Sequence, residues 1–215
     1  MIGVRNMEIG GYIEIDLSPR SNLHEDAIAL NCGRSCVEYL VRSKGIKKLL
    51  LPDYMCDSVS GLCDKLNVEY RKYHISDSFE PSWDFQVDEG EYLYLVDYFG
   101  QLTHECIMKA SEIAAGRLIV DEAQALFRQP IKGFDTLYSP RKFLGIADGG
   151  YLYTDAPWLP GIKKDQSYDR MHFLLGRYEE DASSFYSEYQ NNNDRFIDEP
   201  LKRMSRLTKG LIRSI

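Results

Sequence analysis

Strand-like and helix-like segments alternate along this chain, and the alternation limits its fold more than any other feature of the sequence. Runs rich in leucine, β-branched or aromatic residues predict strands at 47–51, 68–75, 91–97, 117–121 and 149–154. Apolar residues with helical spacing lie between them, at 33–44, 56–66 and 103–115. Such alternation predicts an α/β fold of three layers, in which helices flank a mostly parallel sheet on both faces.

The composition narrows the class of protein. With 215 residues, of which 44% are hydrophobic and 27% charged, the chain has the makeup of a folded globular protein. A net charge of −7 argues against nucleic acid as a partner, and no apolar run approaches the roughly 20 residues that cross a bilayer. We therefore expect a cytoplasmic protein without nucleic-acid or membrane partners. The five cysteines lack metal-ligand spacing, so we expect reduced, mostly buried thiols and no metal site.

Ligands of parallel sheets bind where the carboxyl ends of strands lead into helices. Polar residues follow the predicted strands at four such places, and functional side chains are expected there: 31–35, 53–54, 97–101 and 121–124.

The stretch LNCGRSCVEYL, residues 30–40, opens a predicted helix with a glycine and a small polar residue. The first backbone N–H groups of a helix have no partner within it, and the positive end of its dipole favours anions. Gly33, Arg34 and Ser35 are therefore candidate phosphate-facing residues. The alternative is that these residues only cap the helix.

Asp121 stands at the exit of an apolar strand, LIVD. Loss of hydration there has to be offset by a cation or a strong hydrogen-bond donor. This pattern makes Asp121 a candidate site residue. The alternative is an N-cap for a helix that begins at Glu122.

Lys142 lies in the stretch LYSPRKFLGIADGGYLYT, residues 137–154, among apolar residues and glycines. We expect apolar surroundings to lower the pKa of its amine, which leaves the uncharged nucleophile that attacks a carbonyl. The alternative is an ordinary lysine whose ammonium group reaches water.

Ser139 precedes Lys142 in a Ser-x-x-Lys arrangement. An anion site, a buried acid and a desolvated lysine are together the parts that hold the phosphate, ring nitrogen and aldehyde of pyridoxal 5'-phosphate.

This order and spacing resemble the DegT/DnrJ/StrS sugar aminotransferases, which are fold type I pyridoxal-phosphate enzymes. In that family an acid–x–x–Gln/His motif precedes a lysine that stands six residues before Asp/Glu-Gly-Gly. Asp121 and Gln124 match the first spacing, and Lys142 and residues 148–150 match the second. NCGRSC resembles the phosphate-binding Gly-Thr-Ala segment of the family, with Arg34 where a small hydroxyl residue is usual.

The resemblance implies a fold, a role for each candidate residue and a reaction. The fold would be that of the large domain of fold type I transferases. Lys142 would form a Schiff base with the cofactor, Asp121 would keep its ring nitrogen protonated, and Gln124 would hydrogen-bond the ring or its hydroxyl. Tyr54 would stack on the ring, with Met55 and Cys56 as alternatives, and Ser139 would hold the phosphate together with the amides of 33–35.

The implied reaction moves an amino group from an amino acid, typically glutamate, to a keto sugar linked to a nucleotide, in cell-surface polysaccharide or related sugar biosynthesis. The implied assembly is a homodimer that shares active-site residues between its subunits.

Residues 1–197 would form the cofactor-binding large domain. The stretch NNND at 191–194 predicts a turn, and residues 198–215 predict a helix that starts near Pro200. In the family this helix leads into a C-terminal small domain, which we expect this chain to lack. The helix would then have nothing to pack against beyond the sheet domain.

Two alternative functions follow from the expected lack of that domain. One is a truncated or degenerate homologue that binds the cofactor without turnover, and the other is a non-enzymatic α/β module that binds a nucleotide or a protein.

Overall fold

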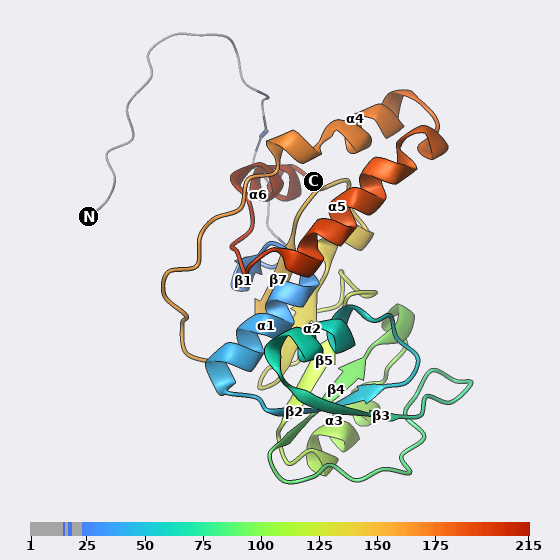
Figure 1. Ribbon diagram of the computed structural model, residues 1–215. Coiled ribbons are helices and arrows are strands. Elements are labelled where there is room, and N and C mark those ends of the chain that lie inside the picture. Colours follow the sequence, from blue (N-terminus) through green and yellow to red (C-terminus); the bar gives the residue numbers. More distant parts are fainter. Residues whose placement is uncertain (1–14, 16, 19–22) are drawn as a thin grey trace.

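The computed structural model describes residues 15, 17–18 and 23–215. Its centre is a seven-stranded sheet with the order β1-β7-β6-β5-β4-β2-β3 (Figure 1). Because β7 is antiparallel to both of its neighbours, the six other strands all point the same way. The predicted α/β fold with a mostly parallel sheet is therefore confirmed. The strands are β1 (Ile28–Leu30), β2 (Lys48–Pro52), β3 (Glu69–Tyr73), β4 (Glu91–Val96), β5 (Leu118–Asp121), β6 (Asp135–Tyr138) and β7 (Gly150–Tyr153).

Helices cover both faces of the sheet. α1 (Gly33–Lys44) and α2 (Ser58–Leu66) contact each other on one face, and α3 (His104–Ile113) lies on the other (Figure 1). Right-handed crossovers explain this arrangement, because the β2-α2-β3 and β4-α3-β5 connections run in opposite directions along the sheet. The helices expected at 33–44, 56–66 and 103–115 are confirmed.

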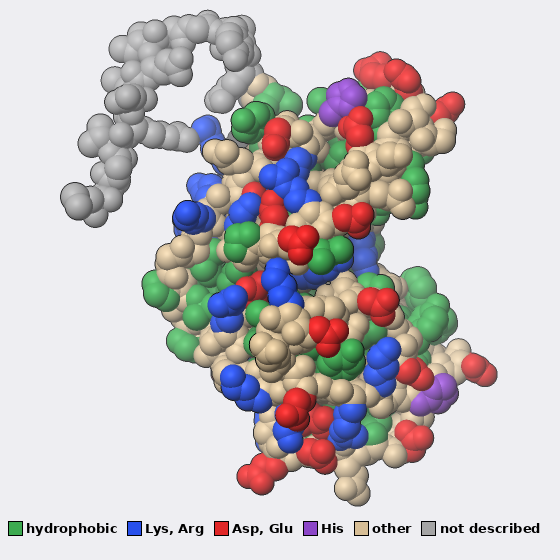
Figure 2. Space-filling view, in the orientation of Figure 1, with side chains coloured by type: hydrophobic (Ala, Val, Ile, Leu, Met, Phe, Trp, Pro, Cys, Tyr) green, Lys and Arg blue, Asp and Glu red, His purple; other side chains and the backbone are tan. Residues whose placement is uncertain are grey.

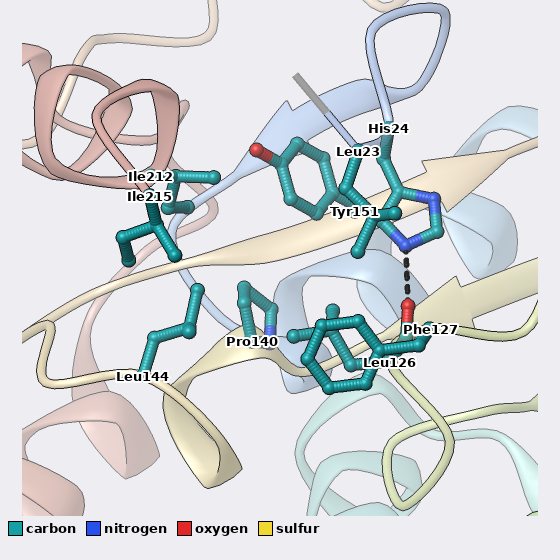
Figure 3. Close-up of a pocket in the computed structure, with 9 residues that line it drawn as sticks. All are labelled: Leu23, His24, Leu126, Phe127, Pro140, Leu144, Tyr151, Ile212 and Ile215. Atoms are coloured by element: carbon teal, nitrogen blue, oxygen red, sulfur yellow. Dashed lines mark hydrogen bonds between the residues drawn. The ribbon is translucent and has the colours of Figure 1, made fainter. Parts of the chain in front are cut away.

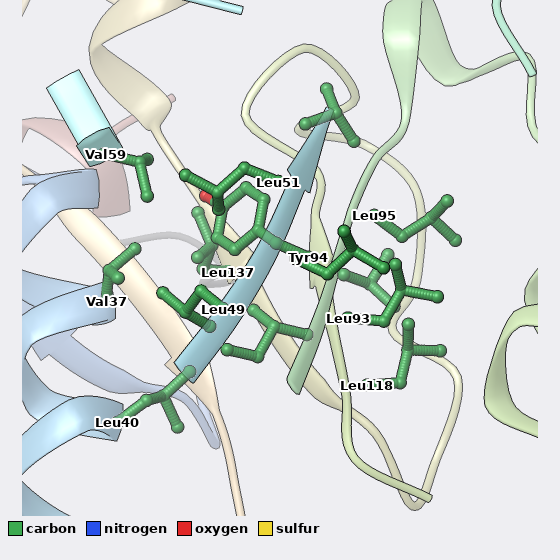
Figure 4. Packing of buried hydrophobic residues seen from close by; sticks show 14 of the residues in the cluster. Val37, Leu40, Leu49, Leu51, Val59, Leu93, Tyr94, Leu95, Leu118 and Leu137 are labelled. Atoms are coloured by element: carbon green, nitrogen blue, oxygen red, sulfur yellow. The ribbon is translucent and has the colours of Figure 1, made fainter. Parts of the chain in front are cut away.

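The main core lies between the sheet and its helices (Figure 4). Leu49 and Leu51 of β2 are fully buried, and they lie in one cluster with Val37 of α1 and Val59 of α2. Both faces of β2 are covered, which is why its residues after Lys48 are continuously apolar and buried instead of alternating. This packing holds the strand ends, and hence the residues after them, at fixed positions.

The C-terminal part differs from the prediction at two places. α4 (His172–Glu179), α5 (Tyr186–Asp198) and α6 (Arg206–Arg213) lie beyond one end of the sheet (Figure 1). The turn predicted at 191–194 is wrong, because these residues belong to α5, where the buried Asn192 donates a hydrogen bond to the Ala147 carbonyl (2.9 Å). No helix described in the structure is long and apolar enough to cross a membrane.

The helix predicted from Pro200 also begins later, at Arg206. The segment before it is extended and bound to the chain around β1: Asn31 N–H donates to the Lys202 carbonyl (3.0 Å) and Met204 N–H donates to the Ala29 carbonyl (3.1 Å). Ile212 of this helix is buried in a second apolar cluster with Tyr138 of β6 and Tyr151 of β7, so α6 packs against residues of the sheet.

The Asp-Gly-Gly motif has a structural role in this arrangement. The fully buried Asp148 carboxylate accepts hydrogen bonds from the backbone N–H (2.7 Å) and the hydroxyl (2.8 Å) of Ser205, and from the hydroxyl of Thr208. Ser205 is the N-cap of α6, where a negative charge is stabilising. Asp148 therefore fixes α6 to the segment that follows Lys142.

Candidate functional site

A large cavity lies at the edge where the parallel strands end. Its volume is about 790 Å³. Figure 2 shows the molecule hollowed beside the projecting C-terminal helices, with Lys or Arg side chains in the hollow. Seven of the eight predicted site residues line the cavity: Gly33, Arg34, Tyr54, Asp121, Gln124, Ser139 and Lys142. The fold thus brings together residues from four separate strand ends, while their roles toward a cofactor stay predictions.

Ser35 does not line the cavity. Its buried hydroxyl donates to Asn31 Oδ1 (2.6 Å), so this side chain serves the β1–α1 junction. α1 begins beside the cavity with Cys32 as its N-cap, and no side chain caps its first turn. The phosphate-facing role of Gly33 and Arg34 stays a prediction. The first-turn N–H groups remain available to an anion.

Asp121 is held by two donors at the end of β5. Its Oδ2 accepts the hydroxyl of Tyr94 (2.7 Å) and its Oδ1 accepts the N–H of Ala123 (2.8 Å). Burial raises the pKa of Asp121, and the Tyr94 hydrogen bond and the charge of Lys142 act in the opposite direction. The N-cap alternative is wrong, because a turn and not a helix follows Asp121. The sheet therefore orients one carboxylate toward the cavity.

Gln124 connects two strand ends. Its Oε1 accepts the N–H of Phe99 (3.3 Å), which lies in the 3-10 helix η1 (Tyr98–Gly100) after β4. Phe99 has a φ of 60°, a left-handed conformation that is uncommon for a large side chain. Gln124 thus supports the backbone at a strained position beside the cavity.

Lys142 is exposed, so the expectation of a desolvated lysine is wrong for this structure. It ends the 3-10 helix η2 (Pro140–Lys142), in which Pro140 turns inward and is buried. Successive residues of such a tight turn point in different directions, so an apolar flanking sequence does not bury each of them. Its neighbour Arg141 is the more enclosed cation, and burial lowers the pKa of Arg141.

Aromatic rings also form part of the cavity wall. Tyr54 lines the cavity and is 61% exposed, and its ring lies 5.7 Å from that of Tyr98 and 6.0 Å from that of Phe79. Met55 and Cys56 line the same wall. The three alternatives for the stacking residue therefore stay open.

Helix α5 supplies a wall that the sequence did not predict. Tyr189, Asn193 and Phe196 of this helix line the cavity, and so does Arg141. Tyr189, Asn193 and Phe196 could have been found only by predicting a helix at 186–198. The polar stretch NNND in that segment favours a turn instead. Arg141 could have been noticed as the cation between Ser139 and Lys142.

A second, smaller cavity of about 220 Å³ lies beside Pro140 of η2 (Figure 3). Its lining is mostly apolar, with Pro140, Leu126 and Ile212 among its residues. The buried His24 donates from Nε2 to the Leu126 carbonyl (2.8 Å), and burial lowers the pKa of His24. A neutral imidazole therefore supports the loop that carries Gln124.

Beside the site lies a buried acidic pair. Asp97 is fully buried and accepts a hydrogen bond from Arg128 Nη1 (2.5 Å), while Glu122 Oε1 lies 3.7 Å from Arg128 Nε. Burial, reinforced by the neighbouring Asp97, raises the pKa of Glu122 to about 9. Glu122 is therefore a neutral acid at pH 7 in the folded protein.

This protonation predicts a pH-dependent stability. The folded pKa of about 9 lies above the ordinary value of 4.5, so unfolding releases a proton between these pH values and stability falls as pH rises through that window. The slope is up to about 1.4 kcal/mol per pH unit for one group. Glu122→Gln is neutral at every pH, and we expect its free energy of unfolding to rise relative to wild type between pH 5.5 and 7.5.

Urea denaturation at the two pH values measures this difference. Glu112→Gln, on the exposed face of α3, is the matched control and is expected to follow wild type. Parallel pH dependences of Glu122→Gln and wild type would contradict a protonated Glu122.

Comparison with known proteins gives similarity of fold and not of sequence. No protein-family model and no curated protein sequence matches the chain. Several solved structures match the chain in fold. The structure of ntda from Bacillus subtilis with bound cofactor PMP has a TM-score of 0.52 at 13% identity, and the match covers 61% of this chain and 33% of that one.

Two further structures match in the same way. For 3-amino-5-hydroxybenzoic acid synthase the TM-score is 0.50 at 16% identity, with 60% of this chain and 38% of that chain covered. Helicobacter pylori PseC is described as an aminotransferase involved in the biosynthesis of pseudoaminic acid. Its TM-score is 0.50 at 15% identity, and the match covers 60% of this chain and 40% of that chain. The chain thus spans less than half the length of these proteins. At such low identity the shared property is the fold, and the chain has the α/β fold seen in these structures, which include an aminotransferase.

Proposed function

We propose that this chain binds pyridoxal phosphate and acts in transamination, with glutamate as amino donor and a nucleotide-linked keto sugar as acceptor. The observation that carries the proposal is the cavity itself. It brings Lys142, Asp121 and the N-terminus of α1 together at one sheet edge, within a fold shared with a structure that carries PMP.

The residues of the cavity fit such a group at both ends. Arg34, Ser139 and the first turn of α1 form an end that suits a phosphate. Asp121 offers a carboxylate oriented by Tyr94 and Ala123, which suits a protonated ring nitrogen. The opposite charges of the two ends match the opposite charges of phosphate and pyridinium.

Each residue then has a definite task. Bound pyridoxal phosphate supplies an electron sink for the carbanion formed at the donor α-carbon. The Lys142 amine would hold the cofactor through its aldehyde carbon and, once the amino group of the donor has displaced it from that carbon, would be free to carry the proton taken from the donor α-carbon. Asp121 keeps the proton on the ring nitrogen, Gln124 orients the ring, and Tyr54 covers one of its faces. A homodimer, in which a second copy covers the exposed Lys142, belongs to the proposal.

A second candidate is a protein that binds the cofactor without turnover. The exposure of Lys142 favours it, because the amine lies outside the apolar surroundings that activate a lysine as a nucleophile.

Covalent trapping tests the proposal. Purified protein mixed with pyridoxal phosphate is expected to turn yellow, and borohydride reduction is expected to attach the cofactor to the peptide that contains Lys142. Lys142→Ala should lose the label, and Lys132→Ala, an exposed lysine before β6, should keep it.

Mass mapping of the label and assay of 2-oxoglutarate from glutamate separate the candidates. Label on Lys142 with 2-oxoglutarate formation supports transamination, and label without it supports cofactor binding alone. An unlabelled wild type, or equal labelling of Lys142→Ala, would exclude both.

A further inference from the structure

Two arginines from separate segments meet at one residue of α5. Arg34, in the first turn of α1, donates from Nη1 to the backbone carbonyl of Asn193 (3.3 Å). Arg141, in η2, donates from Nη2 to the side-chain oxygen of the same Asn193. All three residues line the large cavity. The two guanidinium groups are therefore held close together at one end of it.

Neither of these two charges has an acidic partner within the described part of the chain. Among the residues that the structure describes, neither Arg34 nor Arg141 forms an ion pair with a carboxylate. Arg141 is packed over the Phe196 ring (4.6 Å), and its buried Nε has no hydrogen-bond partner. Enclosing a cation is costly unless an anion and further hydrogen bonds offset the loss of water. The arrangement therefore favours an anionic ligand.

The surrounding donors indicate which anion. The first turn of α1 offers backbone N–H groups, and Ser139 lies beside it, since a Cβ at Gly33 would be 3.8 Å from Ser139 Cβ. A phosphoryl group has three terminal oxygens and close to two charges, so it can accept from the helix, the hydroxyl and both guanidinium groups together. A carboxylate has two oxygens and one charge, and leaves part of this donor set unused.

We propose that Arg34 and Arg141 form a two-guanidinium clamp for a phosphoryl group, positioned by Asn193 of α5. The clamp itself requires only the geometry above. It rests on the proposed function for the source of the phosphoryl group, which is either the cofactor or a nucleotide-linked substrate.

Binding of inorganic phosphate tests the clamp without cofactor or substrate. In isothermal titration of the purified chain, we expect wild type to bind phosphate and Arg34→Gln and Arg141→Gln to bind it about 10- to 100-fold more weakly. Arg177→Gln, an exposed arginine on α4, is the matched control and should bind like wild type.

Circular dichroism checks that each variant is folded. If Arg141→Gln does not fold, Arg141→Lys replaces it, since a lysine keeps the charge and loses the fork of donors, and a several-fold loss is expected. Absence of phosphate binding by wild type at millimolar concentration, or equal affinity in wild type and Arg34→Gln, would overturn the proposal.

Comparison of pyridoxal phosphate with pyridoxal identifies the source. If the clamp holds the cofactor, both Gln variants should bind pyridoxal phosphate no better than pyridoxal, and phosphate should compete with the cofactor in wild type. If it holds a substrate, the variants should bind pyridoxal phosphate like wild type, and phosphate should still bind to cofactor-loaded protein. Failure of Lys142 to take the cofactor would overturn the proposed function and leave the phosphate titration unaffected.

Discussion

Asp121→Asn is expected to keep the cofactor on Lys142 and to lower the rate of amino transfer from glutamate by about 10²- to 10³-fold, the typical cost of removing one aimed electrostatic group from an active site. An asparagine has nearly the same shape, and its oxygen can still accept the Ala123 N–H that Asp121 accepts now. Its amide can donate to the Tyr94 hydroxyl in place of the present bond. What the substitution removes is the negative charge that keeps a ring nitrogen protonated.

Single-turnover assay of 2-oxoglutarate formation, combined with borohydride trapping, measures the two effects separately. Asp64→Asn makes the same chemical change on the exposed face of α2 and should behave like wild type. A rate within a few-fold of wild type, or loss of trapping in Asp121→Asn, would show that Asp121 does not have this role.

Gly150→Ala is expected to lower the free energy of unfolding by about 3 kcal/mol, at the upper end of the cost of overpacking. A Cβ at this position would lie 2.5 Å from the Cys32 carbonyl oxygen and 2.6 Å from its carbon. These are backbone atoms at the junction of β1 and α1, and the pairing of Leu30 with Gly150 prevents the two strands from moving apart without loss of the ladder. Because α1 begins at this junction, phosphate binding should weaken together with stability.

Urea denaturation at fixed pH gives the measurement. Gly61→Ala is the matched control, since Gly61 lies in α2 with no atom within 4 Å of the added Cβ, and we expect it to gain up to about 1 kcal/mol from helix propensity. A Gly150→Ala protein as stable as wild type would contradict the close approach of β7 to the start of α1.

The elements that could be predicted are those whose residues show a pattern of their own. β2 is continuously apolar and α1 has regular amphipathic spacing, so both were found. β1 has only three residues, and β6 has the sequence DTLY, half of which is polar, so neither shows a strand pattern; both exist as strands because they pair with β7. α5 was missed because its polar residues favour a turn locally, while burial of Phe196 and Asn192 favours a helix.

The candidate site likewise has features that the sequence predicts and features that it does not. Seven predicted residues line one cavity because each stands just after a strand, and parallel strands end at one edge. Burial was predicted for Lys142, but Lys142 is exposed, Arg141 is half-buried and Pro140 is buried, because the direction of each side chain in η2 depends on how Pro140 packs.

The sequence by itself determined the α/β class and the polar residues at the ends of β2 and β5, because periodicity and order along the chain are local properties that can be read without the folded core. Only the tertiary structure decided which cation is enclosed and which helix closes the cavity. Arg34 and Arg141 meet Asn193 across 159 and 52 residues of chain. Contacts over such separations depend on the packing of every element between them, and no local pattern encodes them.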